Sequence, residues 1–316
     1  IYDDVSIKET EFEGQCIRKS SFAAWIPIMY GCNNFCAYCI VPYVRGRERS
    51  RSKESIKKEI ERAVAEGFKE FTLLGQNVNS YGKDQGDSHS FAELLKECNE
   101  IAGVERVRYM TSHPRDMSEE VVKVVSESKN ICENFHIPAQ SGSNRILKAM
   151  NRGYTREKYL SLVDSIKKYC PEAAITTDII VGFPGETEED FQDTLSLMQE
   201  VQFDAAYTYI YSKRSGTPAA GFEDQIPLNV KKERLNRLME VQNESSLAKN
   251  KLLIGKKLEV LAEGPSHSNS EFWAGRTRTN KLVLWPIMGK QYTIGQAVNV
   301  EIVSAQTWLL KGKAES

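Results

Sequence analysis

The feature that most constrains the fold is a regular alternation of short apolar runs with longer amphipathic segments. Strands are expected at the apolar runs 25–30, 68–74, 104–110, 134–138, 174–181 and 204–211. Helices are expected where apolar residues recur at helical spacing, at 53–66, 91–101, 118–127, 155–169 and 187–200. This alternation predicts an α/β fold, a partial (β/α)6 barrel whose functional residues lie at the C-terminal ends of the strands.

Three cysteines follow the first expected strand closely, in the pattern Cys32-x-x-x-Cys36-x-x-Cys39. Three thiolates at this spacing can hold three irons of a 4Fe–4S cluster and leave the fourth iron open. The open iron can chelate the amino and carboxylate groups of S-adenosylmethionine (SAM), whose reductive cleavage gives a 5′-deoxyadenosyl radical. Structural zinc is the alternative, but it needs four ligands, and the nearest histidine is the distant His89. We therefore expect these cysteines to be metal ligands at a catalytic centre.

The remaining cysteines carry no comparable signal. Cys98, Cys132 and Cys170 are scattered and are expected to be buried, whereas Cys16 stands alone in a polar segment. An odd count of seven cysteines without a secretory signal argues against disulfides. The chain has 27% charged residues and no apolar run long enough to span a bilayer. We expect a cytoplasmic monomer without membrane contacts.

Residues 31–51, which contain the three cysteines, resemble the cluster motif of the radical SAM methylthiotransferase family, with Tyr38 at its usual aromatic position. Segments 74–82, 136–143, 150–155, 177–187 and 211–219 resemble further signatures of that family, so the resemblance covers nearly the whole chain. Residues 47–51 and 111–115 resemble the MiaB branch, which modifies tRNA. His113 in the second of these segments is suited to acid–base chemistry or simply to satisfying a loop backbone.

The resemblance implies that SAM is held by polar and apolar groups that follow the strands. The expected cofactor-binding set is Gln76, Asn77, Gln140, Ser141, Arg152, Asp178, Ile180 and Val181. The amides of Gln76 and Asn77 can accept hydrogen bonds from the SAM amino group, although a simple polar turn is the alternative. Arg152 can pair with the SAM carboxylate, with a surface salt bridge as its alternative. The strand that carries Ile180 is expected beside the adenine.

The last part of the chain has a different pattern of apolar and charged residues. A long charged helix is expected at 228–252, and short β-type runs follow at 257–261, 281–285, 297–303 and 307–310. This pattern predicts a small all-β barrel, and residues 264–285 resemble a TRAM domain, an OB-like barrel. Such barrels often bind RNA through basic and aromatic side chains. The expected RNA-binding set is Arg47, Arg49, Arg276, Arg278, Lys281 and Trp273, whereas Trp285 and Trp308 are expected in the barrel core.

The expected domains are a linker remnant at 1–24, a radical SAM domain at 25–250 and a TRAM RNA-binding domain at 251–316. In the family, an N-terminal domain with three more cysteines holds a second 4Fe–4S cluster that supplies sulfur. That domain is expected to be missing from this chain, which begins with Ile rather than Met. We therefore expect the chain to cleave SAM without completing methylthiolation.

The resemblance implies methylthiolation at C2 of N6-isopentenyladenosine, next to the anticodon of tRNA. The expected partners are a tRNA anticodon stem-loop and an electron donor such as flavodoxin or ferredoxin. Two alternatives remain open at this stage. One keeps the chemistry but acts on threonylcarbamoyl-adenosine in tRNA or on a ribosomal protein. The other is a non-catalytic RNA-binding protein with a metal-stapled loop.

Overall fold

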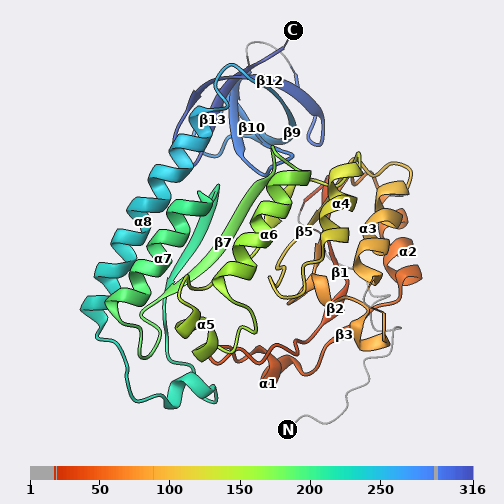
Figure 1. The fold of residues 1–316 in the computed structure, drawn as a ribbon. Coiled ribbons are helices and arrows are strands. Elements are labelled where there is room, and N and C mark those ends of the chain that lie inside the picture. The colour runs from red at the N-terminus through yellow and green to blue at the C-terminus, as the bar shows by residue number, and fades with distance from the viewer. Residues whose placement is uncertain (1–17, 19, 88, 288–290, 316) are drawn as a thin grey trace.

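The computed structural model describes residues 18, 20–87, 89–287 and 291–315 (Figure 1). Most of the expected linker, including Cys16, lies outside these residues. Its expected end at residue 24 is too late, because strand β1 (Ala23–Pro27) begins before it. Among the described residues, no helix is both long enough and apolar enough to cross a membrane.

Six parallel strands form the first part of the molecule. One three-stranded sheet has the order β1–β4–β5, with β4 at Glu70–Leu74 and β5 at Arg106–Tyr109. The other has the order β6–β7–β8, with β6 at Asn134–His136, β7 at Ala174–Val181 and β8 at Ala205–Ile210. A parallel bridge between Val107 and Ile131 joins the two sheets. The predicted partial (β/α)6 barrel is confirmed.

Helices cover the outer face of these strands (Figure 1). They are α2 (Lys53–Ala65), α3 (Ser90–Glu100), α4 (Glu119–Glu127), α6 (Arg156–Tyr169), α7 (Glu188–Val201) and α8 (Leu228–Lys251). Helices α2, α3, α4, α6 and α7 each bury an apolar stripe, which in α2 consists of Ile56, Ile60 and Ala63. The buried side of α8 is mainly polar and includes Lys231 and Gln242. Polar side chains cap several of their N-termini, and Thr187 forms a capping box with Asp190 at the start of α7.

Several short elements were not expected from the sequence. The first expected strand is split into β1 and β2 (Met29–Tyr30), and β2 pairs with β3 (Arg49–Ser50) in an antiparallel ribbon. Short helices α1 (Val41–Arg45) and α5 (Asn144–Ala149) and the 3₁₀ turns at Val78–Ser80, Lys83–Gln85 and Pro218–Gly221 lie between the longer elements. These pieces are too short for periodicity to reveal, because one helical turn shows no repeat.

The last five strands form a closed barrel in the order β10–β11–β13–β12–β9. They are β9 (Lys257–Pro265), β10 (Phe272–Thr277), β11 (Leu282–Pro286), β12 (Ala297–Ala305) and β13 (Leu310–Ala314). Trp285 is fully buried in this barrel, as predicted. The same prediction is wrong for Trp308, which is 59% exposed. Trp308 lies in the turn between β12 and β13 and therefore outside the barrel wall.

The small barrel is seated on the end of the molecule where the parallel strands begin (Figure 1). Arg106, at the start of β5, is 1% exposed and donates hydrogen bonds to the carbonyl of Arg276 at 2.7 Å and to Glu259 Oε1 at 2.9 Å. Arg108 donates to the carbonyls of Thr277 and Arg278. The hydrogen bonds of these arginines fix the small barrel to the strands.

Candidate cofactor site

The cysteine loop, residues 31–40, follows β2 and lies at the opposite end of the strands from the small barrel. Other segments fix its path through backbone hydrogen bonds. Ala37 N donates to the carbonyl of Met150 at 2.9 Å, and the carbonyl of Ala37 accepts from Ala219 N at 2.9 Å. Asn151 Nδ2 donates to the carbonyl of Phe35 at 3.0 Å. The loop is therefore held by chain segments that follow β6 and β8.

Gly31 allows the loop to turn tightly at its start. Its φ is +71°, and a Cβ at this position would lie 2.0 Å from the carbonyl oxygen of Arg47. Only glycine fits both the conformation and the space. The neighbouring Cys32 N donates to the carbonyl of Gly46 at 3.1 Å, so the beginning and end of the motif are pinned together.

The three cysteines line one pocket of about 160 Å³. Asn34 and Tyr38 of the cysteine loop also line it, as does Arg152, which follows α5 (Asn144–Ala149). The other residues around it lie after strands or, for Asp178, within β7, and include Gln76, Ser112, His113, Pro138, Gln140 and Asp178. Among the described residues, no three Cys, His, Asp or Glu side chains converge as ligands of a single metal ion. Three thiolates around one cavity suit a cluster, in which each thiolate binds a different iron.

Cys32 and Cys36 are buried, and Cys39 is partly exposed. Burial raises the pKa of Cys32 to about 11 and raises that of Cys39 above its usual range. A buried thiolate therefore needs positive charge beside it, which a metal centre supplies directly. Cys98, Cys132 and Cys170 are buried free thiols outside this pocket, as predicted.

Arg152 places a cation against this sulfur pocket. The residue is 5% exposed, and its Nη1 lies 3.3 Å from both Cys36 Sγ and the hydroxyl of Tyr38. Its Nη2 donates to the carbonyl of Pro138 at 2.9 Å. No carboxylate among the described residues pairs with it. A buried guanidinium without an acidic partner favours an anionic ligand or thiolate beside it.

Two further polar groups in the pocket wall lack partners. His113 is 5% exposed, its Nδ1 accepts from Arg115 N at 3.2 Å, and its Nε2 has no hydrogen-bond partner. Burial and the nearby charge of Arg152 lower the pKa of His113 to about 2, so its imidazole is neutral. Gln140, 7% exposed at a φ of +68°, also leaves Oε1 without a partner. Unpaired buried polar atoms are rare in folded proteins and here fit a polar ligand.

A larger hollow of about 580 Å³ adjoins the cysteine pocket and shares Tyr38, Cys39 and Asp178 with it. Ile180 and Tyr209 line its strand side. The Asp178 Oδ1 lies 3.5 Å from the Nε2 of His136. Asp178 and Ile180 of the expected cofactor-binding set both line this hollow, and their contact with the cofactor stays a prediction.

Three predicted cofactor contacts are corrected by the structure. Asn77 is fully buried, accepting from His113 N through Oδ1 and donating to Asp116 through Nδ2. Ser141 is 1% exposed and bonds within the chain to Thr194 and Ser143. Val181 lies in the core, because alternate side chains of β7 point to opposite faces and Ile180 already faces the hollow. Gln76 does line the cysteine pocket.

Several predicted RNA contacts instead hold the two parts of the molecule together. Arg278 pairs with Glu133 at 2.6 Å and donates to the carbonyls of Lys129 and Ile131. Lys281 pairs with Asp204 at 2.7 Å. The Trp273 ring is 8% exposed and stacks on Trp285 inside the barrel, so it is not available to a base. These three assignments are corrected.

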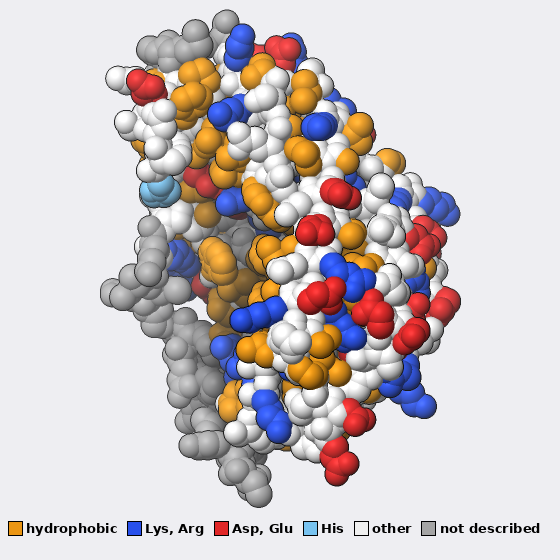
Figure 2. All heavy atoms as spheres, turned by 90° about the vertical axis from the view of Figure 1, so that its left-hand side faces the viewer, with side chains coloured by type: hydrophobic (Ala, Val, Ile, Leu, Met, Phe, Trp, Pro, Cys, Tyr) orange, Lys and Arg blue, Asp and Glu red, His pale blue; other side chains and the backbone are white. Residues whose placement is uncertain are grey.

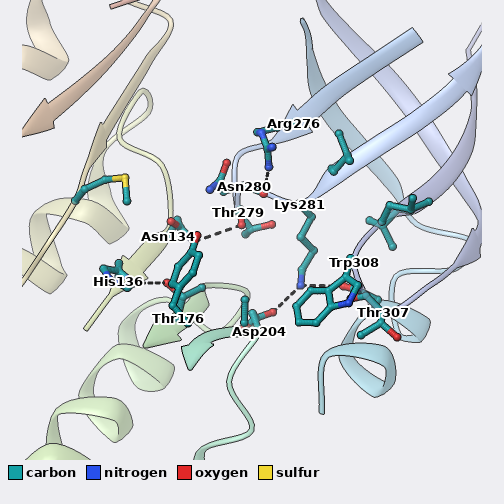
Figure 3. Close-up of a pocket in the computed structure, with 17 residues that line it drawn as sticks. Asn134, His136, Thr176, Asp204, Arg276, Thr279, Asn280, Lys281, Thr307 and Trp308 are labelled. Atoms are coloured by element: carbon teal, nitrogen blue, oxygen red, sulfur yellow. Dashed lines mark hydrogen bonds and ion pairs between the residues drawn. The ribbon is translucent and has the colours of Figure 1, made fainter. Parts of the chain in front are cut away.

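The other predicted RNA contacts lie nearer the surface. Arg47 is exposed, and its guanidinium lies 5.1 Å from the ring centre of Phe35 in the cysteine loop. Arg49 is half-buried in β3. Arg276 is half-exposed, pairs with Glu263 at 3.2 Å and lies at a pocket between the strands and the small barrel (Figure 3). Arg115, the last residue of the 111–115 segment, had no role predicted from the sequence, although its Nη2 donates to Asn34 Oδ1 in the cysteine loop at 2.6 Å.

Comparison with protein families decides the wider assignment. Residues 26–198 match the model of the Radical SAM superfamily. The chain belongs to this superfamily. Residues 251–314 match the model of the TRAM domain, in agreement with the closed five-stranded barrel. The radical SAM match contains the cysteine loop and every residue of the pocket around it.

Curated relatives are similar over most of the chain. A protein of Clostridium botulinum (strain Hall) named tRNA-2-methylthio-N(6)-dimethylallyladenosine synthase is 57% identical over 94% of this chain and 65% of its own length. A protein of Acetivibrio thermocellus with the same name is 56% identical over 93% of this chain and 61% of its length. The chain thus spans somewhat less than two thirds of these relatives.

Solved structures share the fold. Coproporphyrinogen III oxidase (HemN) from Escherichia coli superimposes with a TM-score of 0.55 and 13% identity, covering 82% of this chain and 67% of that one. The radical SAM methyltransferase TsrM from Kitasatospora setae gives a TM-score of 0.53 at 17% identity over 63% of this chain and 38% of that one. At such identities the likeness concerns the fold and leaves the reaction open.

Proposed function

We propose that this chain carries the radical-generating and RNA-binding parts of a tRNA methylthiotransferase that acts at C2 of N6-isopentenyladenosine next to the anticodon. The observation that carries this proposal is 57% identity over 94% of the chain to a relative named for that reaction. The cysteine pocket supports it, because all three cysteines face one cavity with unpaired polar atoms around it. A radical suits this carbon, since it is neither acidic nor nucleophilic.

The residues of the pocket fit a 4Fe–4S cluster with SAM. Cys32, Cys36 and Cys39 would be the thiolate ligands, and when bound the cluster and SAM together supply a 5′-deoxyadenosyl radical. We propose that Arg152 stabilises the Cys36 thiolate through its 3.3 Å contact. Gln76 and Gln140 would accept hydrogen bonds from the SAM amino group.

The adjoining hollow completes this assignment. We propose that Ile180 packs against the adenine, since its side chain faces the hollow beside Cys39. Asp178 reaches both cavities and is suited to a ribose hydroxyl. Neutral His113 offers an unpaired ring nitrogen at the pocket wall and is suited to a polar group of SAM.

The alternatives receive less support. A metal-stapled loop without catalysis does not explain the unpaired groups of His113 and Gln140 at the pocket. Threonylcarbamoyl-adenosine or a ribosomal protein as substrate finds no counterpart in the names of the relatives described above. We further propose that the chain works in the cytoplasm as a monomer, with a tRNA anticodon stem-loop as substrate and flavodoxin or ferredoxin as electron donor.

The deciding experiment uses RNA labelled at the reacting carbon. The chain is reconstituted anaerobically with iron and sulfide, then given SAM, dithionite and an anticodon stem-loop whose isopentenyladenosine carries deuterium at C2. We expect 5′-deoxyadenosine with one deuterium, detected by mass spectrometry, because the radical takes the hydrogen from the carbon that reacts. This readout does not require sulfur insertion.

Two controls define the outcome. An identical stem-loop with threonylcarbamoyl-adenosine deuterated at C2 tests the alternative tRNA substrate. Deuterium transfer from that RNA at an equal rate would contradict the proposed substrate. Absence of 5′-deoxyadenosine despite full iron loading would contradict radical chemistry in this chain.

A further inference from the structure

Three aromatic side chains are unusually exposed along one path. Tyr207 and Tyr209 on β8 are 51% and 52% exposed, and Trp308 in the turn after β12 is 59% exposed. Large aromatic rings are normally mostly buried, so three exposed rings close together require an explanation. Tyr207 and Tyr209 are two residues apart on one strand and therefore point to the same face, about 7 Å apart.

These rings connect the cofactor site to the small barrel through adjoining hollows. Tyr209 lines the 580 Å³ hollow next to the cysteine pocket. It also lines a second hollow of about 270 Å³, together with Tyr207 and Trp308. Tyr207 and Trp308 then line a third pocket of about 180 Å³ at the small barrel (Figure 3). We call Tyr207, Tyr209 and Trp308 the aromatic track.

Polar groups accompany the aromatic track at each step. The third pocket presents side chains of Asn134, Thr279 and Asn280, which can read the edge of a base (Figure 3). The second hollow is bordered by Gln242 of α8, whose Oε1 has no hydrogen-bond partner although the residue is 2% exposed. Figure 2 shows hydrophobic side chains gathered around a hollow on the side of the molecule that carries α8.

Cations lie at both ends of the aromatic track. Arg214 lines the hollow near Cys39, and its residue is exposed. Arg276 lines the third pocket and has a side chain 41% exposed. Two carboxylates also line these hollows: Asp178 lies 3.5 Å from His136, and Asp204 pairs with Lys281 at 2.7 Å. Exposed rings between two arginines complement a phosphate-linked chain of bases better than they complement an apolar peptide.

We propose that the aromatic track binds unpaired nucleotides of the RNA substrate by stacking and leads them from the small barrel to the cofactor site. The proposal rests on the proposed function for the class of ligand, and it names the residues that hold that ligand. Aromatic side chains exposed on a sheet are a general way to bind two or three unstacked bases. The proposal also explains why Trp308 is exposed rather than packed in the barrel core.

The test measures RNA affinity and SAM cleavage separately. Tyr207→Ala and Trp308→Ala are made in the 316-residue chain, and binding of a fluorescent isopentenylated anticodon stem-loop is followed by anisotropy. Each substitution is expected to weaken binding about tenfold, since a base–aromatic stack contributes on this scale. 5′-Deoxyadenosine formation without RNA is expected to stay at the parent level.

Matched variants separate stacking from a loss of structure. Trp308→Phe and Tyr207→Phe keep a ring and are expected to bind RNA within about twofold of the parent. Trp25→Ala removes a tryptophan that is 60% exposed but lines none of the three hollows, and it is expected to leave affinity unchanged. Thermal unfolding of each variant identifies any that fold poorly.

The outcomes separate this inference from the proposed function. Parent-like RNA binding by folded Tyr207→Ala and Trp308→Ala would overturn the track, even if isopentenylated RNA proves to be the substrate. An equal loss of binding in Trp25→Ala would also overturn it. If an unmodified single-stranded RNA binds through the track while deuterium transfer fails, the track stands and the proposed substrate falls.

Discussion

The two ends of the parallel strands hold buried arginines in opposite ways. Where the strands begin, Arg106 and Arg108 donate to backbone carbonyls of the small barrel and to Glu259 or Glu70. Where they end, Arg152 faces the sulfur of Cys36, and His113 and Gln140 each leave a buried atom unpaired. At the first end the chain itself supplies the hydrogen-bond partners of the buried arginines, whereas at the second end a ligand is needed to supply partners for the buried polar atoms.

Basic residues in this chain therefore differ in role according to their partners. Arg278 and Lys281 sit in a segment that suggests RNA contact, yet their charges are neutralised by Glu133 and Asp204 at the joint between the two parts. Arg152 is far from the cysteines in the sequence, but in the fold its guanidinium lies beside the sulfur of Cys36. The partner of a buried charge, rather than its sequence neighbourhood, indicates whether it binds a ligand.

The largest expected effect is a loss of SAM cleavage, and it compares one cysteine at each end of the parallel strands. Cys36→Ala is expected to abolish 5′-deoxyadenosine formation after iron and sulfide reconstitution, because a cluster ligand is lost. Cys132→Ala, near the start of the strands, is expected to retain it, since Cys132 is buried outside the pocket. Mass spectrometry and iron content measure both. Parent-level product from Cys36→Ala would refute the ligand assignment.

The next effect tests the joint where the strands begin. Arg106→Ala is expected to lower the free energy of unfolding by about 3–5 kcal/mol, because it leaves buried acceptors without their donor. Arg276→Ala removes a half-exposed arginine at the same joint and is expected to cost less than about 1 kcal/mol. Urea denaturation gives both values. Similar costs for the two variants would mean that burial does not distinguish them.

A smaller effect is expected from the turn before the cysteines. Gly31→Ala forces a Cβ against the Arg47 carbonyl, so we expect roughly 1–3 kcal/mol of strain and a lower iron content after reconstitution. Gly67→Ala has a similar positive φ but meets no atom within 4 Å, and iron content should be unaffected. Iron analysis with a denaturation curve checks both. Full iron loading of Gly31→Ala would contradict the argument.

The smallest effect depends on pH and belongs to the joint. Burial alone would raise the pKa of Asp204, but Lys281 and Lys249 lower it overall. Its contribution to stability is therefore present above the unfolded pKa, near 3.9, and is lost as pH falls through the lower folded value. Asp204→Asn should lower the Tm by a few degrees at pH 7. A Tm difference from the parent that does not shrink below pH 4 would contradict this assignment.

Much of the fold was predictable because long elements carry their own periodicity. The six parallel strands, the outer helices and a β-rich tail all follow from spacing over many residues. The short helices that shape the site, such as α1 and α5, could not be predicted from the sequence, because a single helical turn has no repeat to detect. Strand alternation was available in the sequence and would have shown that Ile180 and Val181 cannot face one cavity.

The sequence by itself determined the cysteine spacing, the order of strands and helices, and the position of polar groups after each strand. Which of those groups are free to bind a ligand depends on how the chain packs. The side chains of Asn77 and Ser141 form hydrogen bonds with residues distant in the chain, whereas Gln140 keeps an unpaired oxygen beside the cysteines. The physical reason is that hydrogen-bond satisfaction is a property of the packed chain, because each donor and acceptor is supplied by segments that meet only on folding.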